Sequence, residues 1–174
     1  MNQPEVTPIT SVETFLAHAL ELELEAVERY QELADSMATH NNPAVAALFR
    51  EQIGCCAAHV EKVRSWAEGL QLPQLAPWSF QWNCPENPEC LRMELANYLM
   101  EPRVVLTLAL HNEIRGRDFY GRVAASSPNP EVRRLAGLLE QEESEHLAAL
   151  EAALAATGPA PEPVEDFDPP NSPF

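Results

Sequence analysis

Glycine is scarce in this chain: the 174 residues include only six, while alanine, leucine and glutamate dominate. Long stretches also lack the alternation of β-branched and polar residues that half-buried strands show. These two absences argue against a β-sheet and favour an all-α protein. The chain is long enough for one domain with a good core, and it is too short for two comfortable ones.

Basic residues are also few, and the formal net charge is -16. Such a charge repels phosphate backbones and anionic lipid surfaces, so we expect neither nucleic acid nor a membrane as a partner. No apolar run reaches the length of a membrane span, and the opening MNQPEVTPIT has neither the basic start nor the apolar core of a signal peptide. We therefore expect a cytoplasmic protein.

The cysteines do not form the Cys-x-x-Cys pairs that hold rubredoxin-like or zinc-ribbon metal sites. The four are Cys55, Cys56, Cys84 and Cys90. A reducing cytoplasm would keep all of them as thiols. The PENPE stretch between the last two favours a turn, and these two cysteines are left without a predicted role.

Four long helical patterns are separated by prolines. They span about residues 12–39, 43–69, 102–125 and 130–156. A long connection, about 70–101 and rich in proline and tryptophan, separates the second pattern from the third. The final TGPAPEPVEDFDPPNSPF holds six of the sixteen prolines, four acids and no base, which predicts a disordered tail. We therefore divide the chain into a bundle over 1–157 and an acidic, proline-rich tail over 158–174.

The two halves of the chain repeat each other. Glu23 and Glu113 are each followed seven residues later by a tyrosine. The second and fourth patterns both open with Asn-Pro, and each reaches a histidine sixteen residues after the proline, at His59 and His146. Two helical hairpins of one design, joined by a long crossover, predict a four-helix bundle of two antiparallel pairs.

Helical periodicity turns several polar side chains toward the inside of this bundle. Glu23, Glu113 and Glu143 each interrupt an apolar stripe at helical spacing, whereas the neighbouring Glu142 is expected to face outward. The complete inward-facing set is Glu23, Cys56, His59, Glu113, Glu143 and His146.

Three buried carboxylates need compensation, because an unpaired buried charge costs several kcal/mol and the group would protonate instead. We expect hydrogen bonds from the two histidines and two tyrosines to satisfy part of this demand. A pair of divalent cations would satisfy more, since carboxylate and imidazole are ligands that suit iron, manganese and zinc.

One glutamate on each of two helices, followed late in the chain by the Glu-x-x-His of ESEH, resembles the ferritin-like dimetal-carboxylate pattern. The Glu-to-Tyr offset of seven is similar to rubrerythrins in particular. The resemblance implies a ferritin-like four-helix bundle with two metal positions joined by one carboxylate. Its implied ligands are Glu23 and His59 for one metal, Glu113 and His146 for the other, and Glu143 as the bridge.

The resemblance covers about residues 11–155, apart from the crossover, and the chain departs from the rubrerythrin pattern within it. Cys56 stands where a second bridging glutamate is expected, and Gly116 replaces an additional glutamate. The rubredoxin module of full rubrerythrins is missing as well. Cys56 is either a small apolar residue that fills space or a thiolate ligand, and the sequence leaves both readings open.

The function that the resemblance implies is that of a non-haem metalloprotein, an iron-dependent oxidase or peroxidase or an iron-oxidising protein. It would hold one or two iron ions, with manganese or zinc as alternatives. Glu143, Tyr30 and Tyr120 are its candidate catalytic residues, and the tyrosines would tune or protect the site. We also expect a homodimer and a redox partner of unknown identity. The alternative is a ferritin-like bundle with a degenerate metal site, which acts as an interaction or structural protein.

Overall fold

The computed structural model describes residues 8–76, 79–80 and 100–158, and within these ranges the long regular elements are all helices. They are α1 (Val12–Thr39), α2 (Pro43–Trp66), α3 (Pro102–Ser126) and α4 (Pro130–Ala156). The prediction of an all-α protein is confirmed, and α1 and α4 have the expected bounds. The expected end of α2 at residue 69 is wrong, because the chain leaves the helix after Trp66 and Gly69 adopts a left-handed φ of 77°.

The same local signals start α2 and α4. An asparagine precedes each helix, and a proline takes its first position. The side-chain oxygen of Asn42 accepts a hydrogen bond from the backbone N–H of Val45, and that of Asn129 accepts from Glu131 and Val132. These caps satisfy backbone donors that the first turn of a helix leaves unpaired. The repeat in the sequence therefore gives matching starts to the two helices that carry His59 and His146.

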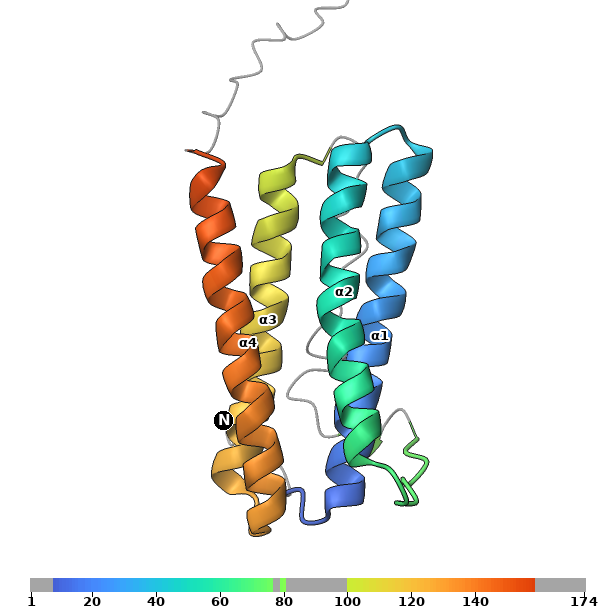
Figure 1. Cartoon of the computed structure of the whole chain (residues 1–174), viewed down its shortest axis with the longest axis vertical. Helices are drawn as coiled ribbons and strands as arrows, with labels where there is room; N and C mark the ends of the chain where they lie inside the picture. Colours follow the sequence, from blue (N-terminus) through green and yellow to red (C-terminus); the bar gives the residue numbers. More distant parts are fainter. Residues whose placement is uncertain (1–7, 77–78, 81–99, 159–174) are drawn as a thin grey trace, which may run out of the picture.

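The four helices lie side by side in two antiparallel hairpins (Figure 1). α1 packs along α2, and α3 packs along α4. α2 and α3 run in the same direction, so the chain has to return the length of the bundle between them. The predicted arrangement of two helix pairs joined by a long connection is confirmed.

Apolar packing is concentrated in two main clusters. The first apolar cluster draws residues from all four helices, including Phe15, Val63, Phe119 and Leu139. The second apolar cluster lies mainly between α1 and α2 and includes Tyr30, Phe49, Cys56 and Val105. On α1, Glu23 lies between Leu22 of the first cluster and Ala26 of the second. A buried polar layer therefore separates two apolar regions.

Several sequence predictions fall on other parts of the chain. The acidic tail beyond residue 158, most of the crossover and both Cys84 and Cys90 lie outside the described residues. Among the helices that are described, none combines the length and the apolar character needed to cross a membrane.

Candidate metal centre

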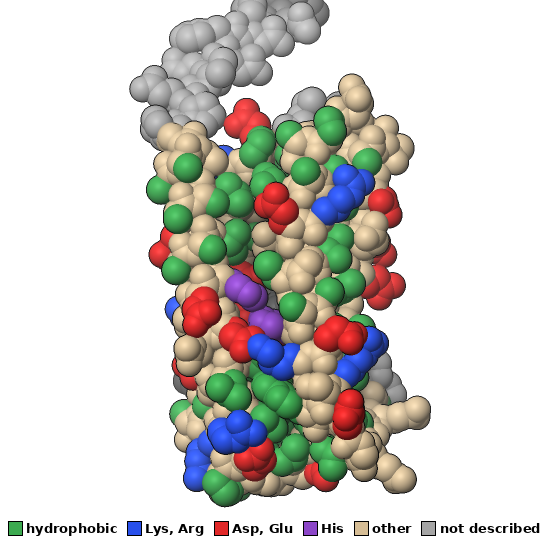
Figure 2. Space-filling view, in the orientation of Figure 1, with side chains coloured by type: hydrophobic (Ala, Val, Ile, Leu, Met, Phe, Trp, Pro, Cys, Tyr) green, Lys and Arg blue, Asp and Glu red, His purple; other side chains and the backbone are tan. Residues whose placement is uncertain are grey.

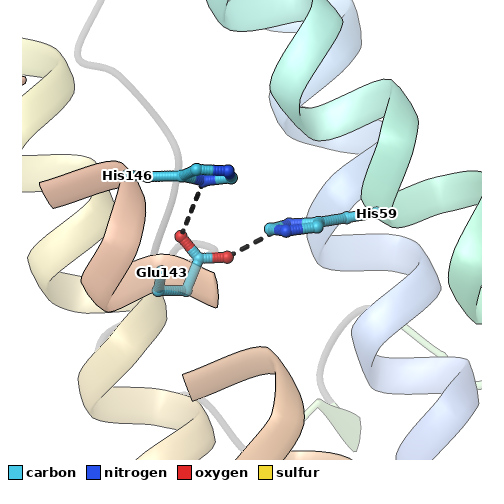
Figure 3. A group of neighbouring side chains, drawn as sticks. All are labelled: His59, Glu143 and His146. Atoms are coloured by element: carbon cyan, nitrogen blue, oxygen red, sulfur yellow. Dashed lines mark ion pairs between the residues drawn. The ribbon is translucent and has the colours of Figure 1, made fainter. Parts of the chain in front are cut away.

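Three of the six predicted ligands converge midway along the bundle. His59 of α2 meets Glu143 and His146 of α4, and one ligand atom from each lies within 4.8 Å of the others (Figure 3). Glu143 lies between the imidazoles, with Oε1 3.2 Å from Nδ1 of His59 and Oε2 3.8 Å from Nδ1 of His146. The two rings stack with their centroids 5.0 Å apart. The Glu143 carboxylate therefore connects the two hairpins.

The other two predicted carboxylates flank this group, one in each hairpin. Nδ1 of His59 donates to Oε1 of Glu23 over 3.2 Å, from α2 to α1. Nδ1 of His146 donates to Oε2 of Glu113 over 3.3 Å, from α4 to α3. Each histidine is thus hydrogen-bonded to the glutamate of its own hairpin.

The two tyrosines take different roles in the two halves. Tyr120 of α3 is fully buried and donates its hydroxyl hydrogen to Oε1 of Glu23 over 2.8 Å. Tyr30 of α1 accepts a hydrogen bond from Nδ2 of Asn112 over 3.1 Å. Asn112 precedes Glu113 in α3 and was not singled out from the sequence. Tyr120 therefore positions the candidate ligand Glu23 across the two hairpins. Tyr30 instead contacts the α3 segment that carries the candidate ligand Glu113.

Cys56 is the predicted ligand whose role the sequence left open. It is buried and belongs to the second apolar cluster with Ala26 and Phe49. Among the described residues, its sulfur is not one of the three ligand atoms within 4.8 Å of one another. Its neighbour Cys55 is partly exposed, and burial raises the pKa of the Cys55 thiol. The charge of His146 lowers the pKa of this thiol, whereas the charges of Glu113 and Glu143 raise it.

The buried polar atoms of the centre fit a metal ion. Glu23 Oε2, His59 Nε2 and Glu143 Oε1 are buried and have no hydrogen-bond partner among the described residues. Glu143 Oε1 lies 3.2 Å from Nδ1 of His59, and His59 Nε2 lies 3.3 Å from Oε2 of Glu142, so these two atoms have ion-pair contacts without hydrogen-bond geometry. Buried polar atoms are nearly always satisfied, and this incompletely bonded layer therefore has carboxylate oxygens available to a cation. Carboxylate oxygen and imidazole nitrogen are the donor types that bind iron, manganese and zinc.

Both imidazoles hold a proton at neutral pH as long as no metal is bound. Burial of His59 opposes its charged form, but the carboxylates of Glu143 and Glu23 outweigh burial and raise the pKa of His59 to about 10. Hydrogen bonds to Glu113 and Glu143 raise the pKa of His146 to about 10, against its partial burial. Protons on the histidines therefore supply positive charge to the carboxylates.

The three carboxyl groups differ in their protonation. Burial raises the pKa of Glu23 in spite of its contact with His59. Burial also raises the pKa of Glu113, together with a hydrogen bond to Glu143, to about 8. Glu143 is buried too, but hydrogen bonds from its three neighbours lower its pKa to about 2. Glu143 is thus the ionised carboxylate between two imidazolium groups, while Glu113 keeps its proton at neutral pH.

Glu142 was expected to face outward, and this expectation is wrong. Its side chain is only 28% exposed, and its Oε2 lies 3.3 Å from Nε2 of His59. The same oxygen pairs with the ammonium of Lys62, three residues after His59 on α2. Helical periodicity places Glu142 beside the inner stripe of α4. Its contact with the His59 imidazole arises because α2 packs close to α4 at this point.

The chain is similar to a crystal structure of an uncharacterized conserved protein, COG1633, from Magnetospirillum magnetotacticum MS-1. The two are 37% identical, the TM-score is 0.68, and the match covers 88% of this chain and 99% of that one. A scan of family models and a search of curated proteins gave no match. Identity at this level over nearly the whole of the other chain indicates common descent.

We predict that the metal-free protein loses stability as the pH rises from 6.5 to about 10. Histidine in the unfolded chain has a pKa near 6.5, and the folded pKa values of His59 and His146 are about 10. The stabilisation from these two protons is therefore complete below pH 6.5 and disappears as the pH passes through 10. Thermal unfolding in a chelator should show a melting temperature that falls by on the order of 5–10 °C across this window.

A matched pair of variants isolates the source of this pH dependence. His146→Gln should flatten the decline in melting temperature, because it removes one of the titrating groups. His111→Gln should preserve the decline, since His111 is exposed on α3 and its Nδ1 bonds to the backbone oxygen of Thr107, away from the buried carboxylates. A wild-type melting temperature that stays constant from pH 6.5 to 10 would show that the buried histidines are not charged.

We predict that Cys56 is a packing residue. Cys56→Ala should leave metal content unchanged and lower the free energy of unfolding by roughly 1 kcal/mol, because it removes a buried sulfur from an apolar cluster. Cys55→Ala is the control, since it removes the same atom from a partly exposed neighbour. Loss of metal in Cys56→Ala with normal metal content in Cys55→Ala would instead identify Cys56 as a thiolate ligand.

Proposed function

The chain belongs to the COG1633 family, and from this premise we propose that it is a rubrerythrin-like, non-haem metalloprotein. The observation that carries the proposal is the convergence of His59, Glu143 and His146 from two hairpins on one buried point. Without a metal, the histidine protons have to supply the positive charge that the buried carboxylates need, and Oε2 of Glu23 still has no hydrogen-bond partner among the described residues. A bound metal ion would compensate the negative charge of these buried carboxylates.

We further propose that the resident metal is iron and that the protein is an oxidase, a peroxidase or an iron-oxidising protein. Glu23 with His59 and Glu113 with His146 would hold the metal, and Glu143 would contact both positions. Iron bound there supplies a centre that exchanges electrons with peroxide or dioxygen. The support for this finer statement is the resemblance of the ligand set to rubrerythrins.

The residues around the centre prepare it for a metal ion. The Tyr120 hydroxyl holds Oε1 of Glu23 in place and leaves Oε2 for another partner. The two imidazoles give up their protons when they ligate, since only the neutral nitrogen binds metal. The two apolar clusters exclude water along the bundle axis on both sides of the polar layer. Solvent reaches the centre beside His146, whose side chain is 28% exposed.

A second candidate function is favoured by the position of Cys56 in the second apolar cluster. A bundle without its second bridging carboxylate would hold metal weakly or not at all. It would then act as an interaction or structural protein. The metal content of the isolated protein separates the two functions.

We predict that protein produced in iron-supplemented medium contains roughly one to two transition-metal ions per chain, as ferritin-like sites do. Glu143→Gln should lower metal affinity by about tenfold or more, because it removes the carboxylate that both histidines share. Elemental analysis and calorimetric titration with Fe²⁺ measure the two quantities. Glu145→Gln is the control, since it makes the same change on an exposed face of α4.

The interaction-protein reading would follow from the opposite outcome. Wild-type protein would then contain no metal, and iron, manganese and zinc would all leave its melting temperature unchanged. Equal metal affinity in Glu143→Gln and Glu145→Gln would place the bound metal somewhere other than the proposed centre.

A further inference from the structure

Lys62 is the only lysine in the sequence, and it lies beside the candidate metal centre. Its ammonium group on α2 contacts the Glu142 carboxylate on α4. The pair therefore spans the seam between the two hairpins. It lies one helical turn beyond His59 along α2 and next to Glu143 along α4.

The Glu142 carboxylate faces the metal centre as well as the lysine. Its Oε2, the same oxygen that pairs with Lys62, lies 3.3 Å from Nε2 of His59. That nitrogen is buried, and its contact with Glu142 is an ion pair that lacks hydrogen-bond geometry. The Glu142 carboxylate thus lies between the Lys62 ammonium and Nε2 of His59.

Solvent meets the centre on this side. The side chains of Lys62 and Glu142 are 35% and 28% exposed, whereas those of Glu23 and Glu143 are at most 2% exposed. Figure 2 shows histidine side chains at the surface midway along the face formed by α4 and α2, with acidic and basic side chains beside them. An ion arriving from water would therefore meet the Lys62–Glu142 pair and the edge of His146, which is also 28% exposed, before it meets the buried Glu23 and Glu143.

We propose that Lys62 and Glu142 form a gate through which divalent cations reach the centre. The proposal rests on the metal-binding function proposed above. The Glu142 carboxylate takes up a hydrated divalent cation by exchanging the Lys62 ammonium for it, and then passes the cation to His59 and Glu143. Between loading events, the Lys62 ammonium occupies the position that the cation takes on Glu142.

The electrostatics of the pair suit such an exchange. A partly exposed ion pair is weakly held in water, so the Lys62 ammonium separates from Glu142 readily. A divalent cation attracts the carboxylate with twice the charge of the ammonium at the same distance. The exchange breaks only ionic contacts, and the freed ammonium returns to solvent, to which it is already exposed.

The gate is tested by the rate of metal uptake. Stopped-flow mixing of metal-free protein with Co²⁺ follows the visible absorption of the bound ion. Lys62→Gln should raise the association rate constant roughly fivefold, because the competing cation is gone, and Glu142→Gln should lower it by a similar factor. In the double variant the rate should equal that of Glu142→Gln alone, since Lys62 acts through Glu142.

Each variant has a control with the same change in charge. Arg64→Gln removes a positive charge two residues from Lys62, where the arginine pairs with Glu61 at the surface of α2. Glu145→Gln removes a negative charge from an exposed position of α4. Both controls should stay within about twofold of the wild-type rate. The Co²⁺ stoichiometry should be the same in all the variants, which shows that the buried ligands are intact.

The single lysine offers a test without mutation. Acetylation of the wild-type protein neutralises Lys62 and should raise the rate of Co²⁺ association as Lys62→Gln does. The same treatment of the Lys62→Gln protein should leave its rate unchanged.

The gate is overturned if Lys62→Gln and Arg64→Gln have the same effect, or if Glu142→Gln takes up Co²⁺ at the wild-type rate. These results leave the proposed function intact, because the wild-type protein still binds metal. Failure of the proposed function is a different result, namely wild-type protein that binds no Co²⁺ at any concentration tested.

Discussion

The contact of the Glu143 carboxylate with the imidazoles of His59 and His146 is the interaction on which the arrangement of the two hairpins depends. Two further acids, Glu23 and Glu113, are buried in the same layer. Buried carboxyl groups in a protein of formal net charge -16 need positive charge close by, and within the described layer the histidines provide it. Contacts between charged groups therefore hold the two hairpins together, as the apolar clusters do.

Protons and metal ions are interchangeable partners in such a layer. Without metal, His59 and His146 keep their protons and bind the carboxylates that surround them. A metal ion would displace these protons and use the same nitrogen and oxygen atoms, so the fold persists in both states. The apolar clusters on either side keep water from weakening either set of contacts. We therefore expect metal binding to leave the fold of the bundle unchanged.

The fold was predictable because its signals are local and are repeated. The Asn-Pro starts of α2 and α4 cap their helices directly, and matching offsets place His59 and His146 at the same height. The inward phase of Glu23 follows from the period of one helix. The position of Glu142 was not predictable, because it depends on the spacing of α2 and α4 across the seam, which no single-helix pattern encodes. Cys56 shares the inner stripe with the ligands, and periodicity cannot separate packing from ligation.

The most direct test of the centre is anomalous X-ray diffraction from crystals grown with Fe²⁺ or Zn²⁺. A metal centre at this seam predicts an anomalous peak enclosed by His59, Glu143 and His146, at about 2.0–2.2 Å from the nitrogen and oxygen ligands. A peak at another position would contradict it. So would a metal-bearing crystal in which Glu143 still contacts both imidazoles and no anomalous peak lies between them.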